Sequence, residues 1–219
     1  MAFGIEAFNA AGETVLNTDN ENLYVLRETV SNSSNRVGVG SLGASSERTY
    51  GDVYLHGWTK RQSRNLFFFE LDPGDAVALH PVNANQFLTN KQAIRVREVC
   101  FASDLPASEM GGDGLAVWDA AGVLIYSASA PLMATRNWFE MPGSGSGFPA
   151  YGFACSDRWY ALARPGFGIF GNGSQTAGPM IGRGVGRFST SRIENADLMY
   201  DGTQIPARFV SDTTIISAL

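Results

Sequence analysis

The chain has 219 residues, a formal net charge of −5 and 17% charged residues, against roughly 25% in an average soluble chain. With 44% hydrophobic residues it is too apolar for a disordered tail, and its length suffices for a large core without disulfide or metal staples. Neither half carries the excess positive charge that nucleic-acid binding requires. No apolar run reaches the roughly 18 residues of a membrane span, so membrane insertion is not expected.

Short segments rich in β-branched and aromatic residues follow one another along the chain, separated by breakers rich in glycine, serine and asparagine. Such segments predict β-strands. They lie at residues 23–26, 36–39, 53–58, 76–80, 93–101, 138–141, 152–155, 168–170, 207–210 and 214–216. No long window shows the 3.6-residue periodicity of a helix. The pattern predicts an all-β chain of antiparallel β-sandwich modules with little helix.

An internal repeat is the most informative feature of the sequence. Residues 4–17 align without a gap on residues 114–127, an offset of 110 positions. Each copy has an apolar strand, an Asn or Asp, two small residues, a glycine and a second strand. Asn and Asp cap turns through their side chains and glycine accepts positive φ, so each copy predicts a β-hairpin.

A weaker echo relates residues 67–74 to residues 159–166, each an aromatic strand that runs into a Pro-Gly turn. Together the two matches predict two related β-modules in tandem, residues 1–110 and residues 111–219, the second with glycine-rich loops. Hairpins also resemble one another through turn chemistry alone, and this alternative stays open. Whether the two modules share one core stays open as well.

Residues that carry catalysis or hold metals are sparse. His56 and His80 lie in no nucleophile motif, and the two cysteines do not have the spacing of a zinc site. Cys100 and Cys155 each lie among apolar and aromatic residues, the usual setting of a buried free thiol, and a disulfide between them is the open alternative. We therefore expect no catalytic residue, no metal and no cofactor.

The second half of the chain is rich in aromatic residues and arginine within glycine-rich segments. Aromatic residues and arginine are enriched at interface cores, whereas lysine, present only as Lys60 and Lys91, is depleted there. A GC-rich genome would also replace lysine by arginine. We expect this material to be exposed as loops and covered by companion proteins. The candidate contact residues are Trp138, Phe148, Tyr151, Trp159, Tyr160, Phe167, Phe170, Arg183 and Arg187.

The first 18 residues, MAFGIEAFNAAGETVLNT, consist of an apolar strand, a turn that ends in glycine, a short second strand and a polar Asn-Thr pair. This opening resembles that of small β-rich minor tail and tail-tip proteins of long-tailed bacteriophages. The resemblance implies a structural protein of the distal tail, in the tail tip or baseplate, that is synthesised in the host cytoplasm and resides in the virion. It implies contacts with other tail proteins and a homo-oligomer around the tail axis, and it supplies no catalytic residues.

Two other functions compete with this one. A receptor-binding module would recognise a glycan or protein of the host cell surface, with sugar rings stacked on aromatic side chains. The candidates for stacking are Trp138, Trp159, Tyr160 and Phe170. A hydrolase of surface glycans would need a pair of carboxylates, such as Asp113 with Asp119.

Overall fold

The computed structural model of the chain describes residues 6–8, 14–17, 22–42, 48–79, 85–109, 115–141, 152–154, 156–164, 168–170, 175–177, 179–183, 192–197, 207–209 and 213–219. All of its sheets are antiparallel, and the described residues outside the strands include two short 3-10 turns, η1 (Ala102–Asp104) and η2 (Ala107–Glu109). The predicted all-β class with little helix is confirmed. Among the described residues, no helix has the length and hydropathy needed to cross a membrane.

The first of two large sheets has six strands. In spatial order they are β12 (Thr135–Met141), β20 (Thr213–Ala218), β14 (Trp159–Arg164), β6 (Leu66–Glu70), β9 (Ala93–Phe101) and β3 (Leu23–Asn32). The second sheet has seven strands. They are β13 (Gly152–Ala154), β18 (Arg192–Asp197), β17 (Pro179–Arg183), β7 (Ala76–Leu79), β8 (Gln86–Thr89), β5 (Arg48–Gly57) and β4 (Arg36–Leu42).

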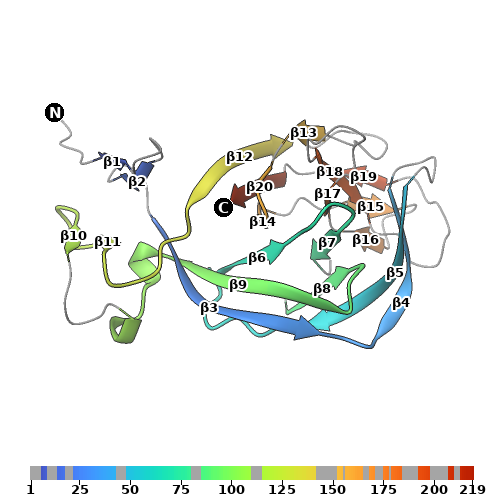
Figure 1. The fold of residues 1–219 in the computed structure, drawn as a ribbon, viewed down its shortest axis with the longest axis horizontal. Helices are drawn as coiled ribbons and strands as arrows, with labels where there is room; N and C mark the ends of the chain where they lie inside the picture. The colour runs from blue at the N-terminus through green and yellow to red at the C-terminus, as the bar shows by residue number, and fades with distance from the viewer. Residues whose placement is uncertain are drawn as a thin grey trace.

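Three smaller sheets complete the described strands. They are the hairpin β1 (Glu6–Phe8) with β2 (Thr14–Asn17), the hairpin β10 (Ala116–Trp118) with β11 (Leu124–Ser127), and the three-stranded sheet of β16 (Gln175–Ala177), β15 (Gly168–Phe170) and β19 (Ala207–Phe209). The two hairpins of the 110-residue repeat are thus confirmed as hairpins. Figure 1 shows the two large sheets wrapped around one interior, which side chains fill.

The interior follows from the alternation of side chains along the strands. In β6, Phe67 and Phe69 point to the interior while Phe68 points to the opposite face, and all three are buried. Phe69 lies 4.8 Å, centroid to centroid, from the ring of Phe87 on β8, which belongs to the other sheet. Burying large aromatic side chains from both sheets supplies the main favourable free energy of this packing.

Strands from both halves of the chain lie side by side in both large sheets. β6 pairs with β14 in the six-stranded sheet, and β7 pairs with β17 in the seven-stranded sheet. β6 and β14 are the two strands of the weaker sequence echo, and they are neighbours, with Phe69 opposite Tyr160. The two halves of the chain therefore share both large sheets and the core between them, which settles whether they have one core or two.

A buried carboxylate fixes the connection between β5 and β6. Glu98 on β9 is fully buried and accepts hydrogen bonds from the Arg27 Nε (2.7 Å), the Arg61 backbone N–H (2.5 Å) and the Asn65 Nδ2 (2.6 Å). A buried charge requires such compensation. The loop after β5 is therefore held against the six-stranded sheet by one carboxylate.

Cys100 on β9 is a buried free thiol, as the sequence predicts. Burial raises its pKa to about 11, so the reactive thiolate is suppressed at neutral pH. Cys155 and its proposed pairing lie outside the described residues.

Candidate functional site

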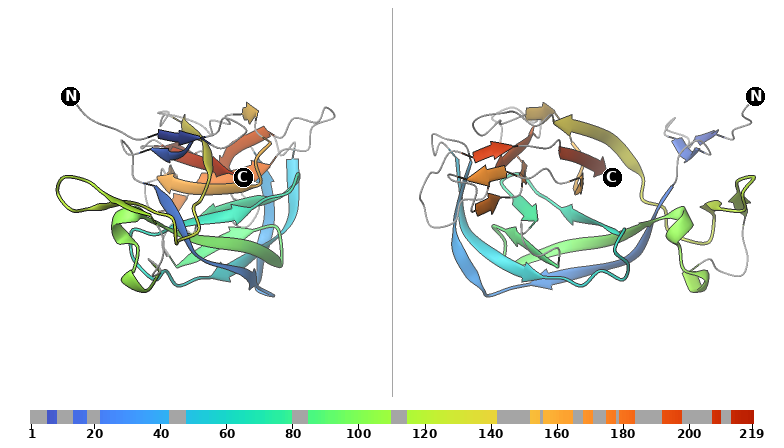
Figure 2. Two further views of the ribbon diagram at one scale, coloured as in Figure 1. Left: turned by 60° about the vertical axis from the view of Figure 1, so that its left-hand side comes forward. Right: turned by 180° about the vertical axis from the view of Figure 1, so that it is seen from behind.

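The two hairpins of the repeat lie at the same end of the molecule, outside the two large sheets. Figures 1 and 2 show β1–β2 and β10–β11 at this end in views from opposite sides. The hairpin β10–β11 has three exposed large apolar side chains and is the candidate interaction site. It consists of residues 115–128 and is called the apolar hairpin below.

The turn of the apolar hairpin has the geometry that its sequence predicts. The Asp119 carboxylate accepts hydrogen bonds from the backbone N–H groups of Ala121 and Val123, each at 2.8 Å. Gly122 adopts a φ of +80°, a conformation that costs little only for glycine. The side-chain cap and the glycine together order a turn whose residues are all exposed.

One side of the apolar hairpin is anchored to the body of the protein. The Ser127 N–H donates to the Tyr24 hydroxyl (2.6 Å), and the Asn22 Nδ2 donates to the Ile125 carbonyl (2.8 Å). Leu124 is buried in a cluster that includes Tyr24 and Leu105. Burial raises the pKa of the Tyr24 hydroxyl, which therefore stays neutral and keeps its contact. The hairpin is thus an ordered projection.

The apolar hairpin also exposes three large apolar side chains. Leu115 is 61% exposed, Trp118 is 55% exposed and Val123 is 41% exposed. Single exposed apolar residues are common on protein surfaces, and three on one short anchored hairpin make it the candidate interaction site. Sequence reasoning found the hairpin and missed this surface. The available signal was the position of Trp118 at the end of a strand, directly before an exposed turn.

The two hairpins have the same strand register. Glu6 pairs with Asn17 and Phe8 with Thr14 in the first, and the second has the corresponding pairs at positions 116–127 and 118–124. The register shifts between the second and third residues of the first strand in both hairpins. The repeat therefore extends from sequence to backbone geometry, including the β-bulge.

Two of the predicted contact residues, Trp159 and Tyr160, are not exposed. They lie in β14, an inner strand of the six-stranded sheet, and are 3% and 0% exposed. The expectation of an exposed loop at this point is wrong, because pairing with β6 and β20 makes the segment a strand that is buried on both faces. The Tyr160 hydroxyl donates to the Asp157 carbonyl at 2.5 Å.

Trp159 is covered by arginine side chains. The guanidinium carbon of Arg97 lies 3.9 Å from the centroid of the indole, and that of Arg95 lies 5.5 Å away. Glu28 forms ion pairs with both arginines. Burial of Trp159 under two cations is a cation–π arrangement that stabilises the sheet and leaves no free face for a sugar ring.

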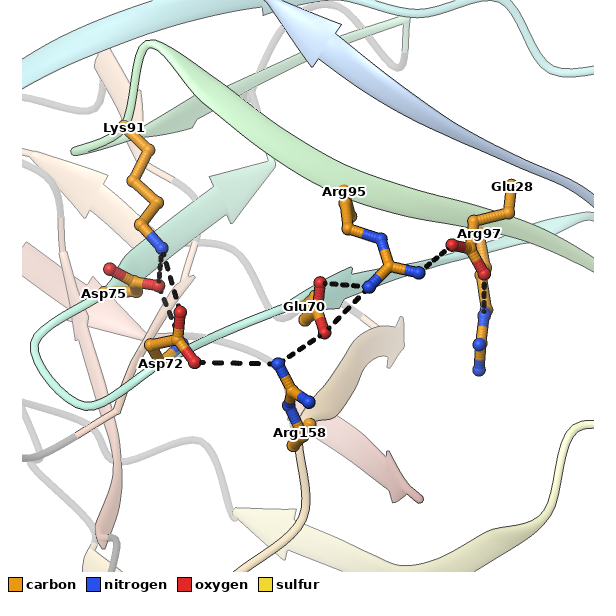
Figure 3. Close-up of polar contacts among 8 residues, drawn as sticks. All are labelled: Glu28, Glu70, Asp72, Asp75, Lys91, Arg95, Arg97 and Arg158. Carbon is orange, nitrogen blue, oxygen red and sulfur yellow. Dashed lines mark hydrogen bonds and ion pairs between the residues drawn. The ribbon is translucent and has the colours of Figure 1, made fainter.

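These arginines belong to a network of alternating acidic and basic side chains, shown in Figure 3. Glu70 links Arg95 to Arg158 (3.0 and 2.8 Å), and Lys91 pairs with Asp75 (2.5 Å) at the far end. The members are Glu28, Glu70, Asp72, Asp75, Lys91, Arg95, Arg97 and Arg158. Four anions and four cations balance, so this network carries no net charge.

Trp138 is exposed, as predicted, and lies on the edge strand β12. Its side chain is 60% exposed. The neighbouring Asn137 donates from Nδ2 to the Asp157 carboxylate (3.0 Å) and to the Ser217 hydroxyl (3.1 Å). Asp157 is buried and also pairs with Arg136 at 3.6 Å. These contacts tie β12 to β20 and to the segment before β14, and the indole of Trp138 remains exposed.

The structure describes only some of the remaining predicted contact residues. Phe170 lies in β15 and Arg183 ends β17. Phe148, Tyr151, Phe167 and Arg187 lie outside the described residues, as do His80 and Asp113. Over the described ranges, no group of three or more His, Cys, Asp or Glu side chains is arranged to hold a metal ion.

His56 occupies a structural position on β5. It is fully buried and stacks on Phe87 at 4.9 Å between ring centroids. Its Nε2 lies 2.9 Å from the Lys91 carbonyl, which can only accept, so Nε2 carries the proton. Nδ1 then accepts from the Ser31 hydroxyl at 3.0 Å. Burial lowers the pKa of His56, and the ring links the two sheets as a neutral group.

No protein-family model, curated protein or solved structure matches this chain.

Proposed function

We propose that this protein is a structural component of the distal tail of a long-tailed bacteriophage, in the tail tip or baseplate, and that it assembles through exposed apolar surface. The observation that carries the proposal is the apolar hairpin, with three large apolar side chains exposed on an anchored projection. Such a surface is unfavourable in water and becomes favourable when a companion protein covers it.

Two further features support a structural role. The N-terminal residues that resemble the opening of tail proteins fold as the hairpin β1–β2. The body of the molecule is a two-layer framework, and a buried hydrogen bond from Ser31 on β3 to His56 on β5 links the two large sheets. The proposed contacts also include the predicted segments that carry Phe148, Tyr151, Phe167 and Arg187.

Purified particles of the phage that encodes the chain provide the test. Mass spectrometry of intact virions should detect the protein, and immuno-electron microscopy should place it at the distal end of the tail. Absence from the virion, or a location in the head, would refute the proposal.

A matched pair of substitutions in the phage tests the apolar hairpin itself. Val123→Glu introduces a charge at a position that is 41% exposed, and Val30→Glu makes the same change at a position on β3 that is 51% exposed. We expect the first to reduce incorporation into particles about tenfold or more, because it places an unpaired charge in the contact. The second should leave incorporation unchanged. Equal incorporation of both variants would remove the hairpin from the contact surface.

Recognition of a host-surface glycan is the second candidate function, and the exposed indole of Trp138 favours it. An exposed indole beside polar groups suits the stacking of a sugar ring, and Arg136 and Glu140 flank Trp138 on β12 and are exposed. Trp138→Ala should abolish binding to purified host polysaccharide, whereas Trp118→Ala on the hairpin should not. Unchanged binding by Trp138→Ala, or no binding by the original chain, would discard this function.

A further inference from the structure

An amine, an amide and a carboxylate are gathered beside the ring of Phe67. Phe67 on β6 pairs with Glu98 on β9, so the two side chains lie on the same face of the six-stranded sheet. Asn65, just before β6, is fully buried, and its Nδ2 donates to Glu98 Oε1 at 2.6 Å. The Lys60 amine lies 5.1 Å from the centroid of the Phe67 ring. The connection between β5 and β6 thus brings a lysine and an asparagine to one buried carboxylate.

The environment of the Lys60 amine favours its nucleophilic form. In the described part of the chain this amine has no carboxylate within ion-pair distance, unlike Lys91, which pairs with Asp75 at 2.5 Å. Burial lowers the pKa of Lys60, and the attraction of Glu98 offsets only part of that effect. A larger fraction of the amine is therefore neutral near pH 7, and the neutral amine is the form that attacks a carbonyl carbon.

The Asn65 amide is the matching electrophile. Its Nδ2 is held by Glu98, whereas its Oδ1 is buried without a hydrogen-bond partner. The indole Nε1 of Trp58, whose ring packs edge-on against Phe67 at 5.2 Å, is likewise buried without a partner. Unpaired buried polar atoms cost free energy, so a free acceptor and a free donor in one cluster call for an explanation. Attack on the amide carbon places negative charge on Oδ1, which a donor in the same cluster stabilises.

We propose that Lys60 and Asn65 join through an intramolecular isopeptide bond and that Glu98 carries the proton. The Lys60 Nζ attacks the Asn65 Cγ and forms a C–N bond, and the bond between Cγ and Nδ2 breaks. Nδ2 takes the electron pair of the broken bond and a proton lost by Nζ, and leaves as ammonia. Glu98 accepts this proton and delivers it to Nδ2, which its carboxylate already contacts, so the carboxylate is regenerated.

The reaction uses only groups that the chain itself supplies, and it is independent of the proposed function. The flexible four-carbon stem of Lys60 allows the amine to move from the Phe67 ring to the amide, because both residues belong to the same short connection. The bond closes this connection covalently at the point where Glu98 holds it by hydrogen bonds. It is a modification of the kind that suits a structural protein.

Mass spectrometry of the purified full-length chain tests the inference. The chain should be lighter than its sequence mass by one molecule of ammonia, either when fresh or after prolonged incubation. Trypsin should release a branched peptide in which residues 49–61 are joined to residues 65–91, because a modified Lys60 is not cleaved. Lys60→Arg keeps the positive charge and should retain the full mass. Lys91→Arg is the matched control and should lose ammonia as the original chain does.

A full mass for the original chain, before and after incubation, overturns the inference. An ammonia loss that persists in Lys60→Arg also overturns it, because Asn65 then cyclises on its own backbone. Glu98→Gln removes the proton carrier and should slow bond formation by about a hundredfold or more, with circular dichroism as the check on folding. Bond formation at the original rate in this variant refutes the role of Glu98. Both lysine variants keep a cation on a partly exposed side chain, so they decide the main question even if Glu98→Gln does not fold.

Discussion

At the scale of single residues, burial decides which of the chemically interesting side chains are available to a partner. Trp159 and Trp138 are both tryptophans in strands of one sheet, yet the first is 3% exposed and the second 60% exposed. The sequence identifies both as candidates but does not contain the sheet order. An inner strand and an edge strand differ through pairing with distant segments, which explains why only one of these two expectations held.

His56 leads to the first prediction, which concerns pH. Burial lowers its pKa in the folded chain, so below the ordinary histidine pKa of about 6.5 the unfolded chain binds a proton that the folded chain does not. The free energy of unfolding must therefore decrease as pH falls through this window. A protonated ring would also lose the hydrogen bond that Nδ1 accepts from Ser31.

Urea denaturation at about pH 7.5 and about pH 5.5 measures this effect on either side of the histidine pKa. His56→Gln cannot titrate, so its free energy of unfolding should fall less between the two pH values than that of the original chain. The comparison with the variant removes the contribution of carboxylates, which both proteins share. Equal losses in the two proteins would contradict a structural role for the neutral ring.

At the scale of elements, the turn of the apolar hairpin depends on one glycine. Gly122 has a φ of +80° and no neighbouring atom within 4 Å of the position that a Cβ would occupy. Gly122→Ala therefore costs only the backbone strain, about 1–2 kcal/mol. Because the hairpin is anchored at one side, this cost should appear as faster hydrogen exchange over residues 116–127.

Gly57 at the end of β5 is the matched control for this substitution. It also has no atom within 4 Å of a Cβ position, and its φ is not in the positive range. Gly57→Ala should leave hydrogen exchange in the hairpin and the overall stability unchanged. If both substitutions accelerate exchange equally, the turn geometry assigned to Gly122 is incorrect.

Local sequence specifies some elements fully and others only in part. β9 and β15 begin and end where the sequence predicts, and β3, predicted at 23–26, extends to Asn32 because it pairs along the whole of β9. β8, β16, β17 and β18 were missed. β8 is short, has polar ends and is held between β5 and β7. β17 lies in a glycine-rich span, a composition typical of loops, but it pairs with β7. Their strand character comes from tertiary pairing.

At the scale of the whole molecule, the shared sheets connect the two sequence halves thermodynamically. β14 lies between β6 and β20, and a single core cluster contains Phe69 from the first half and Ile215 from the second. The repeat therefore accounts for the hairpins that project from the body, while the body itself is built from strands of both halves. A boundary near residue 110 follows from the sequence repeat, but the strand pairs cross it in both large sheets.

The last prediction is that the two halves unfold together. Phe69→Ala removes a fully buried side chain that contacts the opposite sheet and should lower the free energy of unfolding by about 3–5 kcal/mol. Since the core is shared, calorimetry should show one transition with equal calorimetric and van't Hoff enthalpies, shifted as a unit in the variant. Hydrogen exchange should accelerate in β20 as well as in β9, although β20 lies far from the substitution in sequence. Two separate transitions, with only the segments before residue 110 affected by Phe69→Ala, would show that the halves are independent modules in spite of their common sheets.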